Sequence, residues 1–367
     1  MKHGLWCALV MVLMSSPLPA LGQPGLPSGL EVRLAPKQQQ FGADEPILVE
    51  FLLTNTTGAS IDVLKWKTPF DGIFDDMFRV ARGAQTIPYV GPLAKRGKPM
   101  RSDFLTVAPN STMSIAVDLS AAYAVYEAGP YSVVYDPASG GVHVTAPASG
   151  GPPALRKAAV RTNAATFEVT ASRVRPRTSA APATAMVALA PSFDHCSPDQ
   201  KSQAQAALPE AVRISGEAVK ALQGARPNDR PKAARYKAWF GLYTDTRYAK
   251  VKAHFDKIHD ALANKAVSFD CGCKKANTYA YVYPSQPYKI FLCPKFWSAP
   301  AKGNATDSRP GTLVHETSHF NVVAGTDDFV YDQEGAAALA LDDPDQAVMN
   351  ADNHEYFAEN TPPKPMK

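Results

Sequence analysis

The first half of the chain alternates hydrophobic and polar residues with the period of two that marks β-strands. Alternating stretches occur at residues 30–34, 47–53, 113–119, 131–135 and 167–169. Turn-rich clusters, such as residues 55–58 and 139–141, separate them. Short alternating stretches without a convincing helix are typical of an antiparallel sandwich. We therefore predict an all-β, immunoglobulin-like sandwich domain over residues 23–172.

The second half has a different pattern, in which hydrophobic residues recur mostly with helical spacing. Helices are expected over residues 203–222, 248–263, 311–319, 333–341 and 343–357. Pro209 is expected to mark a helix start inside the first of these, since proline suits the first helical position. Residues 277–283 and 288–293 alternate like strands around a proline-containing turn, which predicts a hairpin. Residues 192–367 are thus expected to form an α+β domain.

Two further segments lie outside these patterns. Residues 173–191 are rich in Ala, Pro, Arg, Ser and Thr, which is linker composition, and their arginines also suit a processing site. At the N-terminus, Lys2 and His3 precede an apolar stretch at residues 5–14 and small residues at 20–22. This is the arrangement of a secretory signal, and the apolar stretch is too short to span a membrane comfortably. We predict that residues 1–22 are a signal peptide, that the protein is secreted, and that no membrane span remains after signal removal.

Composition and charge narrow the classes of protein further. The chain has 367 residues, of which 45% are hydrophobic, and this is enough for two domain cores. The formal net charge is only +4, and the chain contains no block of like charges. A nucleic-acid partner is therefore not expected.

Four cysteines remain once the signal is removed, all in the second half: Cys196, Cys271, Cys273 and Cys293. An even number of cysteines in an exported protein implies disulfides. Cys271 and Cys273 are too close in sequence to bond each other without strain. We expect Cys196 to pair with Cys271 and Cys273 with Cys293. A cysteine-rich zinc site is the weaker alternative, because the C-x-C sequence has no matching second pair or histidine.

Residues 311–320 carry the strongest chemical signal, the sequence His315-Glu316-Thr-Ser-His319. Histidines four residues apart on a helix project from the same face, so two imidazole nitrogens can reach one Zn²⁺. Glu316 would flank the metal and is expected to act as the general base. The alternative is a solvated helix with two incidental histidines.

A catalytic zinc site requires a third protein ligand. The extended pattern H-E-x-x-H-x-x-G-x-x-H fails, because the chain has Val322 and Gly325 where that pattern needs glycine and histidine. Gly325 can instead reverse the chain after the helix, since glycine adopts positive φ without cost. Such a reversal would bring one of two neighbouring carboxylates, Asp327 or Asp328, back toward the histidines.

The H-E-x-x-H sequence followed by Gly325-Thr-Asp-Asp328-Phe-Val-Tyr331 resembles the aspzincin, or deuterolysin-type, zinc metallopeptidases. The resemblance implies a zincin-like fold for the C-terminal domain. It also implies that one Zn²⁺ is bound by His315, His319 and Asp328. Asp327 is then expected to be a surface or turn residue.

The same resemblance assigns a role to Tyr331, whose hydroxyl would donate a hydrogen bond to the oxyanion of the tetrahedral intermediate. One departure affects this assignment. The family usually has glycine after the tyrosine, whereas this chain has Asp332. If the backbone there needs positive φ, aspartate tolerates it better than most residues.

The segment at residues 350–360 is similar to the peptidyl-Lys metalloendopeptidase branch of the family, and so is the arrangement of the cysteines. Members of this branch cleave on the amino side of lysine, and the resemblance implies that Asp352 and Glu355 form the S1′ pocket. Residues three apart share a helix face, and two carboxylates facing an ammonium make a cation pocket. A solvated acidic helix end is the alternative, and His354 between the two carboxylates is expected at the surface.

Together these features predict a secreted zinc endopeptidase that hydrolyses peptide bonds before lysine in polypeptide substrates. Two alternatives remain open: a broad-specificity aspzincin protease, and a non-catalytic surface-binding protein with a degenerate zinc site. The N-terminal sandwich has three interpretations. It is a cleaved propeptide, as in a zymogen, a retained binding module, or an inhibitor that contacts the catalytic domain and covers the cleft.

Overall fold

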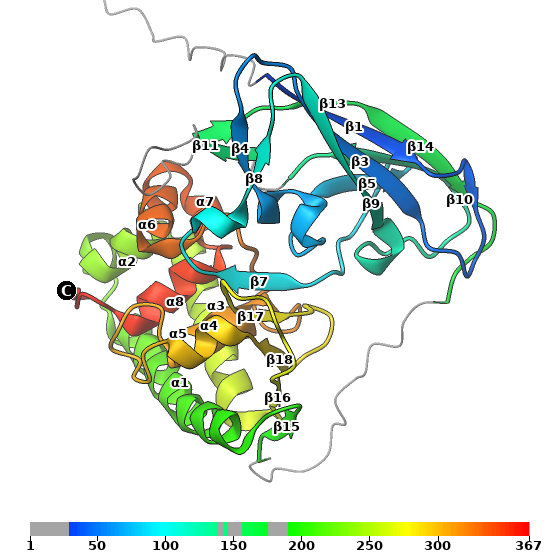
Figure 1. Cartoon of the computed structure of the whole chain (residues 1–367). Coiled ribbons are helices and arrows are strands. Elements are labelled where there is room, and N and C mark those ends of the chain that lie inside the picture. The colour runs from blue at the N-terminus through cyan, green and yellow to red at the C-terminus, as the bar shows by residue number, and fades with distance from the viewer. Residues whose placement is uncertain (1–28, 138–141, 146–155, 175–189, 367) are drawn as a thin grey trace, which may run out of the picture.

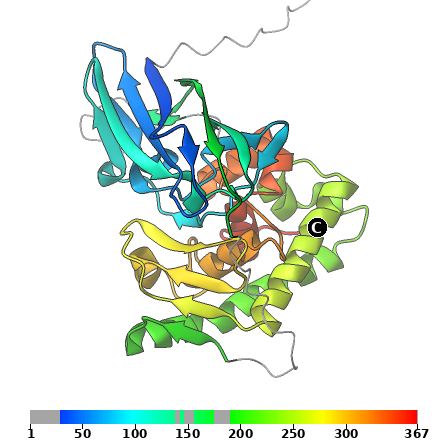
Figure 2. The same ribbon diagram turned by 90° about the vertical axis from the view of Figure 1, so that its right-hand side faces the viewer.

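The computed structural model describes residues 29–137, 142–145, 156–174 and 190–366. The predicted signal peptide and most of the predicted linker lie outside these ranges. An all-β N-terminal half lies over a C-terminal half of helices and one sheet (Figure 1), and the view from the side shows the same two layers (Figure 2). The two predicted fold classes are confirmed.

The N-terminal half consists of short strands in three sheets, with the orders β13-β1-β3-β9, β2-β14-β10-β5-β6 and β12-β11-β4-β8. The strands are β1 (Leu30–Pro36), β2 (Gln40–Phe41), β3 (Leu48–Asn55), β4 (Ile61–Leu64), β5 (Phe78–Arg82), β6 (Gln85–Ile87), β8 (Phe104–Val107), β9 (Ser111–Asp118), β10 (Gly129–Tyr135), β11 (Val142–Thr145), β12 (Arg156–Ala158), β13 (Arg161–Thr162) and β14 (Ala164–Val169). Side chains from all three sheets, among them Phe51, Val63 and Val80, share one hydrophobic core. In β3, buried residues alternate with partly exposed ones, as the period-two pattern predicts.

Strand β7 (Leu93–Arg96) of the N-terminal half belongs to a sheet of the other half. It pairs antiparallel with β17 (Thr278–Val282) and forms an edge of the C-terminal sheet, whose order is β15-β16-β18-β17-β7. Figure 1 shows β7 at the junction of the two halves. The halves are therefore joined by strand pairing as well as by side-chain contacts.

The C-terminal half surrounds one buried helix, α5 (Arg309–His319), with other helices and the sheet. Its other helices are α1 (Pro198–Gly224), α2 (Ala234–Phe240), α3 (Asp245–Asn264), α4 (Pro294–Ser298), α6 (Asp332–Asp342), α7 (Pro344–Ala347) and α8 (Ala351–Glu359), and its other strands are β15 (Ser192–Asp194), β16 (Ser268–Asp270) and β18 (Lys289–Leu292). Strands β17 and β18 pair antiparallel, which confirms the predicted hairpin. Helices α1, α3 and α8 pack against α5 and hold it in the core.

Two predictions about helix boundaries are wrong. Helix α1 begins at Pro198 and runs through Pro209 without a break. An interior proline costs about 3 kcal/mol, but the buried face around Ala207 and Ala211 packs against α3 and α5, and this burial outweighs the cost. The segment 343–357 is two helices, α7 and α8, because Asn350 leaves the helical conformation between them.

Two disulfides lie in the C-terminal half and join the expected pairs. Cys196 is bonded to Cys271, and Cys273 to Cys293. The first ties the start of α1 to the end of β16, and the second ties the β16–β17 connection to the end of β18. They reinforce the side of the sheet away from β7. Among the described residues, none of the helices combines the length and apolarity that crossing a bilayer would demand.

Candidate active site

Helix α5 presents the H-E-x-x-H residues inside the protein. Its first turn is capped by Ser308, whose Oγ accepts a hydrogen bond from the Gly311 main-chain N–H at 2.9 Å. His315, Glu316 and His319 are completely buried. Two histidines on one face of a buried helix cannot be a solvated surface pair, so the incidental-histidine alternative does not fit this geometry.

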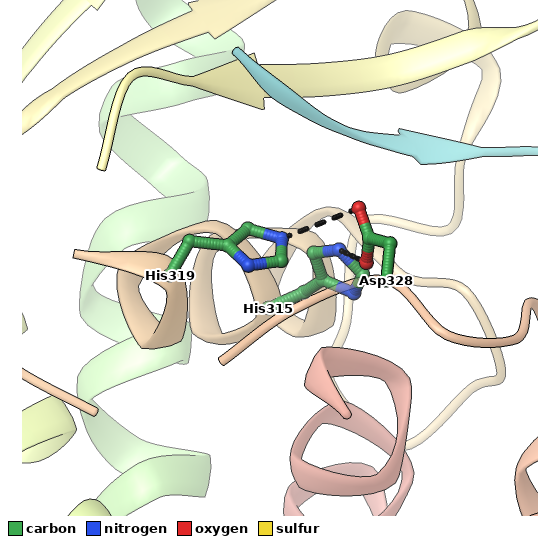
Figure 3. Close-up of side chains that lie close together, drawn as sticks. All are labelled: His315, His319 and Asp328. Carbon is green, nitrogen blue, oxygen red and sulfur yellow. Dashed lines mark ion pairs between the residues drawn. The ribbon is translucent and has the colours of Figure 1, made fainter. Parts of the chain in front are cut away.

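The turn after α5 returns the chain to the two histidines. Gly325 has a φ of +59°, as the sequence predicted for a reversal. The Thr326 N–H then donates to the Ser318 carbonyl at 3.2 Å, and His319 Nδ1 donates to the Thr326 carbonyl at 2.9 Å. Because Nδ1 is engaged by this carbonyl, Nε2 is the nitrogen of His319 that faces the cluster, and it points at the Asp328 carboxylate (Figure 3).

The atoms of this cluster are spaced as ligands of one ion. His315 Nε2 lies 3.2 Å from Asp328 Oδ1, and His319 Nε2 lies 3.5 Å from Asp328 Oδ2. Two donors that are each about 2.0–2.1 Å from a tetrahedral zinc ion are about 3.3 Å apart. Neither nitrogen, and neither oxygen of Asp328, has a hydrogen-bond partner, although all four are buried. Buried polar atoms are rarely left without partners, so this donor set fits a bound zinc ion.

Asp328 is the carboxylate that the turn delivers, whereas Asp327 supports the turn. The Asp328 N–H donates to Asp327 Oδ1 at 2.8 Å, and Asp327 forms an isolated bridge with Asn350. Burial alone would raise the pKa of Asp328, but the adjacent imidazoles of His319 and His315 hold that pKa far below its usual value. The Asp328 carboxylate is therefore ionised, as a metal ligand must be.

Asn350, in the break between α7 and α8, fixes the loop that carries Asp328. Its Oδ1 accepts hydrogen bonds from the Phe329 and Val330 main-chain N–H groups at 2.9 and 3.3 Å. Its own amide nitrogen donates to Asn353 Oδ1 at 2.8 Å. The interruption between α7 and α8, which was not predicted from the sequence, therefore helps to position the loop that carries Asp328.

Glu316 lies beside the cluster without joining it. Its Oε1 accepts a hydrogen bond from the main-chain N–H of Lys95 in β7 at 3.3 Å, and its Oε2 has no partner. Burial raises the pKa of Glu316 to about 7. A carboxyl group that binds and releases a proton near neutral pH is suited to general acid–base chemistry.

Tyr331 packs against the 3₁₀ helix η1 (Lys65–Lys67) of the N-terminal half. Its ring centroid lies 6.3 Å from that of Trp66, and Lys67 Nζ lies 5.0 Å from the ring centroid. Burial and the Asp328 carboxylate raise the pKa of Tyr331 well above its usual value, so the hydroxyl keeps its proton and can donate. The next residue, Asp332, has a φ of +66°. Glycine adopts this conformation readily, and the aspzincins that the sequence resembles usually have glycine at this place.

Asp352 and Glu355 both point from α8 to the same place, on the other side of His315. His315 Nδ1 lies 2.8 Å from Asp352 Oδ1 and 3.4 Å from Glu355 Oε2. A carboxylate behind a metal-binding histidine fixes the orientation of the ring. Both carboxylates are buried, so the alternative of a solvated acidic helix end is wrong.

These two carboxylates and Asp307 surround the ammonium group of Lys95. Lys95 Nζ lies 2.7 Å from Glu355 Oε2, 3.0 Å from Asp307 Oδ1 and 3.3 Å from Asp352 Oδ1. Burial alone would lower the pKa of Lys95, but the three carboxylates raise it well above its usual value. The rings of Tyr279 and Tyr356 lie 5.2 and 5.5 Å from the same nitrogen. We call this group of three carboxylates and two tyrosines the acidic pocket.

Three members of the acidic pocket were not predicted from the sequence, and one neighbouring residue was predicted in the wrong place. Asp307, Tyr279 and Tyr356 were not singled out as site residues, because no motif marks them and each comes from a different element. His354, expected at the surface, is wholly buried. Its Nδ1 donates to the Asn350 carbonyl at 3.0 Å, and its Nε2 accepts from His254 Nδ1 at 3.0 Å. It faces away from the carboxylates because residues adjacent on a helix lie on different faces.

Comparison with known proteins agrees with this geometry. The aspzincin family model, described as lysine-specific metallo-endopeptidase, matches residues 225–359. The extracellular protease of Aeromonas hydrophila is 40% identical over 346 residues, which cover 93% of this chain and 95% of that protein. The peptidyl-Lys metalloendopeptidase of Grifola frondosa is 36% identical over 260 residues, 71% of this chain and 70% of that protein.

A third relative matches a shorter stretch. The peptidyl-Lys metalloendopeptidase of Pleurotus ostreatus is 44% identical over 170 residues, which cover 46% of this chain and 97% of that protein. The structure shows a buried helix with two histidines and an aspartate that a turn brings back to them, and one relative at 40% identity matches nearly the whole chain. This chain belongs to the aspzincin family of metallo-endopeptidases.

Proposed function

We propose that this protein is a secreted zinc endopeptidase that hydrolyses peptide bonds on the amino side of lysine. The main evidence for the substrate preference is the acidic pocket, in which three carboxylates surround the ammonium group of Lys95. The pocket lies next to His315, His319 and Asp328, which we call the zinc-ligand cluster. The relatives named peptidyl-Lys metalloendopeptidase support the same preference. Export is supported by the two disulfides and by the relative named extracellular protease.

His315, His319 and Asp328 would hold the zinc ion. When bound, zinc would supply a Lewis acid for the peptide carbonyl and lower the pKa of a water molecule. The chain provides the surroundings that this chemistry needs. The Thr326 carbonyl and the Asp352 carboxylate orient the two imidazoles, and burial keeps the ligands out of bulk water.

Glu316 is the general base in this proposal. Its carboxylate takes the proton of the attacking water and passes it to the amine that leaves. The contact between Glu316 Oε1 and the main-chain N–H of Lys95 supports the second step, because it puts the carboxyl group beside the nitrogen of a lysine whose side chain is in the acidic pocket. Tyr331 keeps its proton and would donate a hydrogen bond to the oxyanion.

The acidic pocket selects lysine through charge, reach and shape. A lysine side chain is long enough to carry its ammonium to the carboxylates, and its three N–H groups match three acceptors. A neutral side chain of the same length would leave the carboxylates buried and unpaired, which costs several kcal/mol. The alternative of a broad-specificity protease gives Asp307, Asp352 and Glu355 no role in substrate binding.

Mapping of cleavage sites tests the proposal. The protein recovered from the medium of an expressing host, in its intact form and in any shortened form, is incubated with an unfolded protein, with and without a chelator. We expect new N-termini that begin with lysine, and none with the chelator. Cuts without lysine at P1′ would favour the broad-specificity alternative. No cuts by any form, with zinc bound, would favour the non-catalytic alternative.

A further inference from the structure

Strand β7 lies along the C-terminal sheet in the way that a bound peptide would. It pairs antiparallel with β17, with Ala94 opposite Tyr281 and Lys95 opposite Ala280. Addition of an extended segment to an exposed sheet edge is a common mode of peptide recognition. In Figure 3, β7 is the cyan strand that passes beside the ligand cluster. The N-terminal half therefore supplies the strand that fills this edge.

The side chain and the main chain of Lys95 both occupy substrate positions. Its ammonium is held by Asp307, Asp352 and Glu355 in the acidic pocket. Its main-chain nitrogen lies 3.3 Å from Glu316 Oε1, where the proposed mechanism requires the nitrogen of the bond to be cut. The bond from Ala94 to Lys95 thus has its nitrogen beside the proposed general base and its lysine side chain in the acidic pocket, as a scissile bond would.

Contacts on both sides of β7 close the remaining access to the site. Arg96 pairs with Asp71 at 2.7 Å, and its guanidinium lies 5.2 Å from the Trp66 ring centroid. On the far side of Asp328, the buried Lys67 pairs with Asp75 and donates to the Asp328 main-chain carbonyl at 3.3 Å. His315, Glu316 and His319 are left with no exposed surface, so an outside peptide has no path to them.

We propose that Lys95 is a built-in substrate mimic and that the N-terminal half keeps the enzyme latent by holding this lysine in its own specificity pocket. This inference rests on the proposed function, because it uses the same pocket. The partner that the N-terminal half excludes is a peptide with lysine at P1′. The enzyme becomes active only when β7 leaves β17 and takes Lys95 with it.

A binding experiment tests the inference without relying on turnover. The full chain carries Glu316→Gln to prevent cleavage and a recognition site for an added protease inserted between residues 173 and 191. After this nick, a fluorescent peptide with one internal lysine is titrated and its anisotropy is measured. The affinity for the peptide is compared between the chain with Lys95 and the variants Lys95→Ala and Lys95→Met. Lys98→Ala is the matched control, because the Lys98 side chain is 72% exposed.

We expect the nicked chain with Lys95, and the Lys98→Ala control, to bind the peptide at least tenfold more weakly than the Lys95→Ala and Lys95→Met chains. Native mass spectrometry should show the two halves together when Lys95 is present and separating more readily in the two variants. A content of about one zinc ion per chain shows that each variant is folded. Equal affinity with and without Lys95 would overturn the inference.

A second peptide separates this inference from the proposed function. In the second peptide, norleucine replaces lysine and keeps its length without the charge. If the Lys95→Ala chain binds both peptides equally, the lysine pocket itself has failed. If the Lys95→Ala chain prefers the lysine peptide, but the chain with Lys95 binds that peptide equally well, the pocket stands and only the proposal of latency has failed. If none of the chains binds either peptide, both have failed.

Discussion

The cluster of His315, His319 and Asp328 and the acidic pocket lie on either side of the His315 ring but are assembled in opposite ways. The cluster comes from one short segment, residues 315–328, folded back on itself by the turn at Gly325. The pocket draws on residues that lie 212 and 257 positions from the lysine it holds. The residues of the proposed metal site are thus close together in the sequence, whereas the proposed selectivity and latency depend on how distant segments pack.

Removal of a ligand should have the largest effect. We expect Asp328→Ala to lose bound zinc and all cleavage activity, because two histidines alone do not complete the coordination of a catalytic site. Asp327→Asn is the matched control, since it keeps the oxygen that accepts the Asp328 N–H. Zinc per chain is measured after dialysis. Equal zinc retention in both variants would remove Asp328 from the ligand set.

Loss of the general base should separate chemistry from metal binding. We expect Glu316→Gln to lower kcat/KM by about 10²–10⁴-fold, while zinc content stays at the level of the unchanged chain. The reason is that Glu316 lies beside the ligands and makes no ligand contact of its own. A variant that retains activity would contradict the assigned role, and a variant that loses zinc would mean that Glu316 shapes the cluster.

Changes in the pocket should alter selectivity and leave the metal in place. Asp307→Asn should lower the ratio of kcat/KM for lysine over norleucine at P1′ by about 10–100-fold. This factor corresponds to the free energy of one charge-assisted hydrogen bond. Asp345→Asn is the control, because its side chain is 78% exposed and on another face. An unchanged ratio for Asp307→Asn would restrict the pocket to the two residues that the sequence indicated.

The disulfides should matter only for the half that contains them. Replacement of Cys273 and Cys293 together by alanine opens a loop with a sequence separation of 20 residues. The expected loss is about 3 kcal/mol of unfolding free energy. In a calorimetric scan of the full chain we expect the transition of the C-terminal half to move to lower temperature. A shift of both transitions by the same amount would mean that the halves unfold as one unit.

The buried histidine pair should give the C-terminal half a smaller, pH-dependent loss of stability. Burial lowers the pKa of His254 to about 4, below its ordinary 6.5, so the folded protein binds fewer protons than the unfolded chain. Stability is therefore lost as the pH falls below 6.5, by about 2 kcal/mol at pH 5. Urea midpoints measured across this range should flatten in His254→Gln. The exposed His195, replaced by Asn, is the control.

The sequence alone determined the features that depend on short-range geometry. Helical periodicity places His315 and His319 on one face, and a glycine at the right distance permits the turn that returns Asp328. Alternation over residues 30–135 was enough to predict an all-β half, because strands such as β3 and β10 bury every second residue. The disulfide pairs were also correct.

Only the tertiary structure decided where Lys95, Asp307 and the pocket tyrosines meet. Lys95 lies in a short basic stretch that resembles many solvated lysines, and its burial becomes favourable only once three carboxylates surround it. The same holds for Pro209 and His354, whose local preferences were outweighed by packing in the core. Local sequence sets what a side chain can do, and long-range packing sets which partners and how much water it meets.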